Sequence, residues 1–160
     1  MSKVGNMTQV SLENTELVLN ALETNGEFIS RTRGVSMRPL FRQGKDLVVI
    51  TKPTRELKKG DVPLYKRRKY DFLVLHRILE VKEDHYVIRG DNTYSLEHVP
   101  KDFVVGVLKE FYRNGKYVNC ETSKGYKLYV KFINLIYPLR FLWAKIIRPF
   151  LAKIKHLIFK

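Results

Sequence analysis

Short runs of β-branched and aromatic residues, separated by turn residues, recur from residue 46 to residue 118. They predict strands at residues 46–51, 62–65, 72–81, 85–89, 104–112 and 117–118. Asn114-Gly115, between the last two, is the dipeptide most typical of a two-residue hairpin. Pro63 has no N–H to donate, so its strand is expected at a sheet edge or a bulge. The spacing predicts a mainly β fold with a twisted, partly closed sheet.

Helical periodicity flanks this region on both sides. Residues 8–24 form an amphipathic helix pattern, with Ser11 or Asn14 as its cap and Asn25-Gly26 as its end. From about residue 126, apolar residues recur at steps of three and four, with prolines that should kink or divide the helix. We therefore expect an N-terminal helical segment at 1–29, a β domain at 30–125 and a helical tail at 126–160.

The chain is strongly basic, with a formal net charge of +14, and residues 126–160 contain no Asp or Glu. Such a balance indicates an anionic partner. An apolar stripe with Trp143 and flanking Lys and Arg is the pattern of an interfacial helix, so residues 131–160 are expected to contact an anionic membrane surface. Packing within the protein or against a partner is the alternative. Nucleic acid is disfavoured, because the stripe is too apolar for an electrostatic arm.

Targeting and redox features are sparse. The N-terminus has no basic patch followed by an apolar run, and no stretch of about 18 uncharged apolar residues occurs. The single cysteine, Cys120, allows no internal disulfide, which fits a reducing compartment. These features favour a cytoplasmic protein, or one peripheral at a membrane.

Three polar residues at turns or strand ends could carry chemistry: Ser36, His76 and Asp91. A serine hydroxyl needs an adjacent base to become a nucleophile, and the ordinary pKa of histidine suits that role. A carboxylate can hold the other ring nitrogen and stabilise the imidazolium. Taken singly, each residue is more typical of a turn or a packed strand, so spacing alone does not select this trio.

Five short motifs change that weighting, because they occur in the order seen in the S24/S26 serine peptidases, the signal peptidases and LexA-like self-cleaving proteins. The chain resembles this family over roughly residues 30–112. The motifs are Gly34-Val35-Ser36-Met37-Arg38-Pro39, Lys59-Gly60-Asp61-Val62, Leu75-His76-Arg77-Ile78, Arg89-Gly90-Asp91-Asn92 and Val105-Gly106-Val107.

The resemblance implies a role for each site residue. Ser36 matches the nucleophile, and His76 stands where most bacterial members have a lysine base, as in the archaeal and endoplasmic-reticulum signal peptidases. The acidic third member is either Asp91, in the Gly-Asp-Asn motif, or Glu97, the nearest acid beyond it. We favour Asp91 and keep Glu97 as the alternative.

Residues beside the nucleophile are expected to shape the site. Signal peptidases usually carry a serine two positions before the nucleophile, where this chain has Gly34. Backbone N–H groups near Ser36 would then make most of the oxyanion hole, with Met37 and Pro39 shaping the loop. The resemblance implies no cofactor and no metal.

The expected function is that of a serine endopeptidase cutting a signal or leader peptide, with a peptide or preprotein as substrate. One alternative is a non-catalytic S24/S26-like protein that binds peptides or membranes. A LexA-like self-cleaving regulator is the other. It is weakened because residues 1–30 are too short for a helix-turn-helix domain, and the chain contains no Ala-Gly or Cys-Gly dipeptide.

Overall fold

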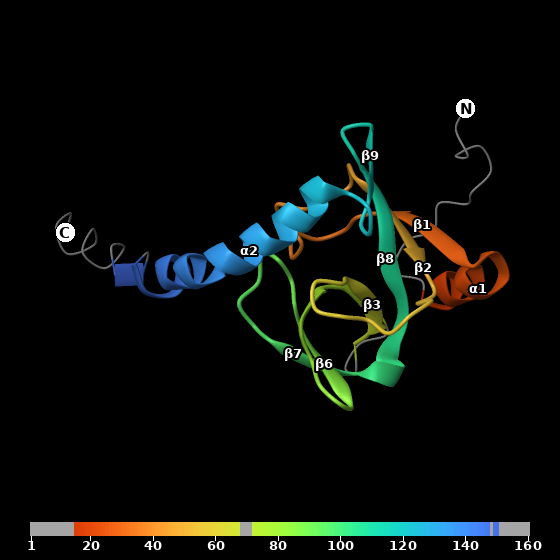
Figure 1. Ribbon diagram of the computed structural model, residues 1–160, viewed down its shortest axis with the longest axis horizontal. Helices are drawn as coiled ribbons and strands as arrows, with labels where there is room; N and C mark the ends of the chain where they lie inside the picture. The colour runs from red at the N-terminus through yellow and green to blue at the C-terminus, as the bar shows by residue number, and fades with distance from the viewer. Residues whose placement is uncertain (1–14, 68–71, 148, 151–160) are drawn as a thin grey trace. The chain divides into compact units, whose positions relative to one another are not determined.

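The computed structural model describes residues 15–67, 72–147 and 149–150. The chain divides into two compact units, Met1–Ser123 and Lys124–Lys160. Among the described residues of the first unit, helix α1 (Thr15–Asn25) precedes nine strands, and in the second unit helix α2 (Lys124–Leu142) continues into a π-helix (Trp143–Ile147). The prediction of a mainly β fold with a helix before it and a helix after it is confirmed (Figure 1). Residues 8–14, including both cap candidates, lie outside the described residues.

The strands form two antiparallel sheets. A six-stranded sheet has the order β1-β2-β8-β3-β4, with β9 also paired to β8, and a three-stranded sheet has the order β5-β6-β7. The long strand β8 runs through the middle of the larger sheet and joins β2 to β3 (Figure 1). The strands are β1 (Glu27–Arg31), β2 (Leu47–Thr51), β3 (Pro63–Lys66), β4 (Leu73–Leu75), β5 (Arg77–Val81), β6 (His85–Arg89), β7 (Glu97–Pro100), β8 (Val104–Arg113) and β9 (Lys116–Asn119), with a short 3-10 turn at Lys101–Phe103.

The strands differ from the predicted ones in two ways, and the alternative left open for Pro63 is decided. The single strand predicted at 72–81 is divided at His76, because β4 pairs in the larger sheet and β5 in the smaller. Of the two positions expected for Pro63, the sheet edge is excluded, since β3 lies between β8 and β4. Pro63 is the first residue of β3, and the pairing with β8 shifts register between Leu64 and Tyr65, so a bulge accommodates this end of the strand. Strands β1 and β7 were not predicted.

The Asn114-Gly115 hairpin is confirmed. Asn114 and Gly115 have φ values of 51° and 72°, as the tightest two-residue turn requires, and they join β8 to β9. Gly26, with φ of 71°, follows the last residue of α1, as expected for a helix end.

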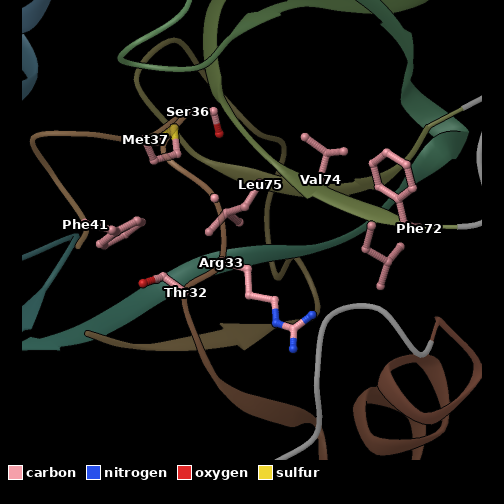
Figure 2. Close-up of a pocket in the computed structure, with 10 residues that line it drawn as sticks. Thr32, Arg33, Ser36, Met37, Phe41, Phe72, Val74 and Leu75 are labelled. Carbon is pink, nitrogen blue, oxygen red and sulfur yellow. The ribbon is translucent and has the colours of Figure 1, made fainter. Parts of the chain in front are cut away.

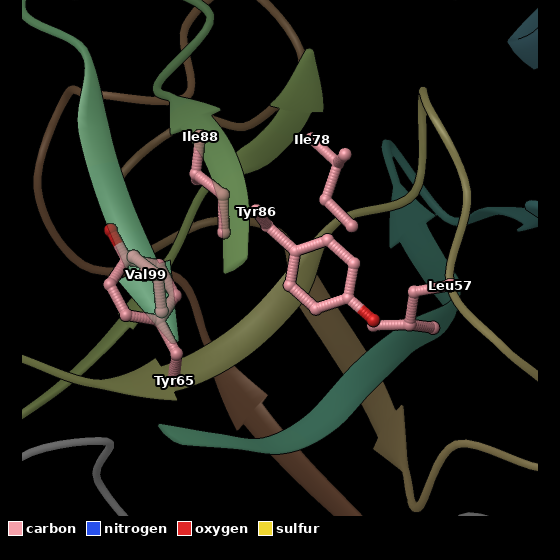
Figure 3. Close-up of a cluster of buried hydrophobic side chains, with 6 residues drawn as sticks. All are labelled: Leu57, Tyr65, Ile78, Tyr86, Ile88 and Val99. Atoms are coloured by element: carbon pink, nitrogen blue, oxygen red, sulfur yellow. The ribbon is translucent and has the colours of Figure 1, made fainter. Parts of the chain in front are cut away.

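A buried apolar cluster lies where the two sheets face each other (Figure 3). Tyr65 comes from β3 of the larger sheet, and strands β5, β6 and β7 of the smaller sheet supply most of the others. The cluster consists of Leu57, Tyr65, Ile78, Tyr86, Ile88 and Val99. Burial of these side chains holds the two sheets together.

Pro138 lies inside α2 without ending it, so the expected division at this proline is not seen. The helical geometry changes further on, in the π-helix that begins at Trp143. Among the described residues, none of the helices is both long enough and apolar enough to cross a membrane.

We predict that Gly106→Ala destabilises the larger sheet. A Cβ at Gly106 would lie 2.6 Å from Cγ2 of Ile50 and 3.2 Å from the carbonyl oxygen of Thr51, where β8 pairs with β2. Such overpacking costs about 1–3 kcal/mol of unfolding free energy, measurable by denaturant unfolding. Gly125→Ala is the control: this exposed position in α2 should keep or slightly raise stability. Equal stability of Gly106→Ala and the parent chain would contradict the close packing of Gly106 against β2.

Candidate active site

Ser36 lies on the loop between β1 and β2, and a buried carboxylate closes the base of this loop. Asp46 is fully buried and accepts hydrogen bonds from the backbone N–H of Arg42 at 2.7 Å and from its guanidinium. Burial alone would raise the pKa of Asp46, but these bonds from Arg42 outweigh it and lower that pKa. The Thr32 N–H donates to the Asp46 carbonyl at 3.0 Å, which ties the two ends of the loop together.

The residues expected to shape the loop have defined places in it. Gly34 has φ of 74°, a conformation that a side chain would strain, so a glycine suits this backbone. Met37 is buried, and the Arg38–Pro39 peptide bond is cis. The guanidinium of Arg113, at the end of β8, donates to the Pro39 carbonyl at 2.7 Å.

The Gly90-Asp91-Asn92 turn contacts the Ser36 loop directly. The Asn92 N–H donates to the Ser36 carbonyl at 2.7 Å, and the Asn92 side-chain amide donates to the Val35 carbonyl at 3.2 Å. A Cβ on Gly90 would lie 2.7 Å from the Ser36 carbonyl oxygen, so only glycine allows this approach.

His76 and Ser36, the two residues expected to do the chemistry, meet beside Gly90. A Cβ at Gly90 would be 3.0 Å from His76 Nε2 and 3.1 Å from Ser36 Cβ, so the ring nitrogen and the serine side chain border one small volume. Within the described part of the chain, the Ser36 hydroxyl and the His76 ring do not form a hydrogen bond. In serine enzymes this contact is often long and tightens only when substrate binds.

The other ring nitrogen of His76 is held by Glu97. Nδ1 lies 3.1 Å from Oε1 of Glu97 and 3.2 Å from the Tyr65 hydroxyl, while Arg67 Nε lies 3.2 Å from Oε2 of Glu97. The hydrogen bond from His76, opposed by burial, lowers the pKa of Glu97. Because a carboxylate can only accept, Nδ1 of a neutral ring carries the proton and Nε2 keeps its lone pair.

Tyr65 and Arg67 belong to this network although the sequence analysis did not select them. Burial, together with the nearby Glu97 charge, raises the pKa of Tyr65, so its hydroxyl stays a neutral donor. Arg67 places a positive charge on the outer side of Glu97. The available signal was that Tyr65 lies on β3, next to β4, and that Arg67 directly follows β3, but pairing register is needed to use it.

Asp91, the favoured third member, lies against a different residue. Its two carboxylate oxygens accept from Arg77 Nε at 2.8 Å and from Arg77 NH2 at 2.7 Å, and both side chains are buried. Arg77 also donates to the Gly60 carbonyl at 2.9 Å. Asp91 therefore joins β5 to the turn beside Ser36, whereas the acid that contacts His76 is Glu97.

A pocket of about 380 Å³ opens beside Ser36 (Figure 2). The Ser36 loop forms one side of it and β4 another, and Figure 2 shows Ser36 and Met37 bordering the same space as Val74 and Leu75. In the described structure, β4 ends the strand order of the larger sheet. The lining is mostly apolar: Thr32, Arg33, Gly34, Ser36, Met37, Phe41, Phe72, Leu73, Val74 and Leu75.

Metal ligation finds no support in the described ranges, where no three His, Cys, Asp or Glu side chains gather closely enough to hold an ion. The arrangement can instead transfer a proton. The Ser36 side chain lies beside Nε2 of His76, and the Glu97 carboxylate contacts the other nitrogen of the same ring.

We predict that His76→Ala raises the pKa of Glu97. The hydrogen bond that lowers this pKa is lost while the burial that opposes it remains. Carboxyl-carbon NMR titration would measure the change, with Glu80, whose pKa is lowered by Lys82, as the internal control.

In the parent chain, Glu97 stabilises the folded state above its ordinary pKa of 4.5, and this stabilisation is lost as the pH falls through its lowered pKa. An unchanged Glu97 pKa would contradict the contact with His76.

Neither the models of known protein families nor the curated proteins match this chain. The function is therefore inferred from the geometry around Ser36 and from the five motifs in the sequence.

Proposed function

We propose that the chain is a serine endopeptidase of the S24/S26 kind, with Ser36 as nucleophile and His76 as general base. The observation that carries the proposal is the convergence of the Ser36 side chain and His76 Nε2 beside Gly90, with Nδ1 of His76 hydrogen-bonded to Glu97. The mainly β fold and the order of the five motifs support this proposal.

The chemistry follows from these positions. Ser36 Oγ attacks the peptide carbonyl carbon while its proton passes to His76 Nε2. The tetrahedral intermediate collapses as His76 returns the proton to the leaving amine, and an acyl group remains on Ser36. Water, deprotonated by His76, then attacks the ester carbonyl and releases the second product, with the proton returned to Ser36.

Stabilisation of the developing oxyanion is assigned to backbone N–H groups. The N–H groups of Ser36 and Met37 donate no hydrogen bond to other described residues, so they are available to a substrate oxygen. Gly34 has no side chain that could donate in their place. Loss of one such donor typically raises the barrier by about 3 kcal/mol.

Glu97 is a better candidate than Asp91 for the acidic residue that acts with Ser36 and His76. Its carboxylate contacts His76 Nδ1, where it fixes the tautomer and stabilises the imidazolium formed during catalysis. Asp91 is occupied by both bonds from Arg77 and acts by positioning the turn that approaches Ser36.

The substrate is an extended peptide. The side of β4 that has no strand partner among the described residues offers backbone groups to an added strand. The apolar pocket beside Ser36 then receives a side chain near the cut, which fits the apolar segment of a signal or leader peptide.

We expect Ser36→Ala and His76→Ala each to lower kcat/KM for a peptide substrate by several powers of ten. The double variant should lose no more than either single one, because the two groups act as a unit. A fluorogenic peptide library would identify a substrate for the parent chain first. Ser95→Ala, at an exposed serine of the same unit, is the matched control.

The binding-only alternative makes the opposite prediction. It is favoured by the absence of a Ser36–His76 hydrogen bond in the described structure. If the parent chain binds a peptide that it never cleaves, or if Ser36→Ala cleaves as fast as the parent, the peptidase proposal is wrong.

Glu97→Gln and Asp91→Asn should separate the two acids. Glu97→Gln is expected to lower kcat by about a hundredfold or more with little loss of folding stability, because it disturbs the His76 tautomer. Asp91→Asn should mainly lower stability, by about 3 kcal/mol, because it leaves the buried Arg77 charge uncompensated. Thermal unfolding and kinetics on the same samples check both. A large loss of kcat in Asp91→Asn, with kcat unchanged in Glu97→Gln, would assign the role beside His76 to Asp91 instead.

A further inference from the structure

Helix α2 carries a stripe of exposed apolar side chains. Leu128, Leu135 and Leu139 are 69%, 77% and 68% exposed, values that are unusual for leucine. With Phe132 and Leu142 they follow one another at steps of four and three, which places them on one side of the helix. Trp143, Ile146 and Phe150 are also exposed beyond the end of α2.

The stripe is distinct from the buried side of the same helix. Among the described residues of α2, Tyr126 and Ile133 are buried. At 100° per residue, both lie roughly opposite the line from Leu128 to Leu139. A contiguous exposed apolar surface of this kind marks an interaction site.

Charge limits what can cover the stripe. Residues 124–160 contain nine Lys and Arg residues and no Asp or Glu. By helical spacing, Lys127 and Lys131 flank the stripe on one side, whereas Arg140 lies toward the side of Ile133. Pairing two copies of this surface would bring like charges together, so self-association through it is disfavoured. An anionic surface with an apolar interior satisfies both features at once.

We propose that α2 lies flat on an anionic lipid membrane, with the stripe from Leu128 to Leu142 and Trp143 in the acyl boundary. Lys131 lies within the body of the helix rather than at either end, which fits an axis parallel to the surface. Long Lys and Arg side chains can bury their stems beside the stripe and reach lipid phosphates. This surface is separate from the proposed peptidase site and does not depend on its activity.

Trp143 provides a direct test, because it is the only tryptophan in the chain. The full-length protein is titrated with vesicles of phosphatidylcholine alone or with about one third phosphatidylglycerol, and tryptophan emission is recorded. We expect a blue shift with the anionic vesicles that weakens as salt is raised, and quenching by brominated lipid tails. Ser36→Ala should bind vesicles as the parent does, so loss of peptidase activity leaves this result unchanged.

Two sets of substitutions separate the apolar and electrostatic contributions. The stripe variant, Phe132→Gln with Leu135→Gln and Leu139→Gln, should abolish the blue shift. Replacing four cations by Gln should weaken binding several hundredfold, since each contributes about fivefold near an anionic surface. These cations are Lys124, Lys127, Lys131 and Arg140.

Matched controls use exposed residues of the first unit. Leu17→Gln with Val81→Gln and Leu96→Gln tests the loss of exposed apolar area, and should bind as the parent does. Removal of four exposed lysines tests net charge, and should have a much smaller effect than removal of the cations of α2. These lysines are Lys52, Lys58, Lys109 and Lys116.

Several results would overturn the proposal. They are an absent blue shift with anionic vesicles, equal binding to neutral vesicles, and full binding by the stripe variant with its helix content retained in circular dichroism. Tighter binding to duplex DNA or RNA than to vesicles at the same salt would assign the basic surface to nucleic acid instead.

Discussion

The buried ion pair between Arg77 and Asp91 fixes the region on which the candidate site depends. Two charged groups are removed from water, and their two short hydrogen bonds, with a third to the Gly60 carbonyl, offset that cost. The neighbours of this pair in sequence are His76 and Gly90, the residues that meet beside Ser36. Their relative position is thus set by a contact one residue away, where the chain passes from β4 to β5.

Much of the fold could be predicted from local sequence. β-Branched runs predicted β2, β3, β6 and β8, and Asn114-Gly115 predicted the hairpin to β9. What could not be predicted depends on partners distant in sequence. The run from residue 72 to residue 81 is continuous in composition, and only pairing with two different sheets divides it at His76.

The site shows the same limit. Ser36, His76 and the Gly90 turn could be selected from motifs, because each motif is local. The choice between Asp91 and Glu97 could not be made that way, because it depends on which strand lies behind the imidazole. Tyr65 and Arg67 were missed for the same reason, since the contact of Tyr65 with His76 and that of Arg67 with Glu97 join segments that are distant in sequence.

The central position of β8 has a consequence for the order of events during synthesis. Ser36 lies between β1 and β2, whereas His76 follows β4, and β8 is the strand that joins β2 to β3 in the larger sheet. Because β8 begins at Val104, a nascent chain already contains Ser36, His76 and Glu97 before the strand that joins β2 to β3 has been made. The larger sheet can therefore be completed only after Tyr112, the last partner of β2 in β8, has left the ribosome, so shorter chains contain the site residues without the complete sheet.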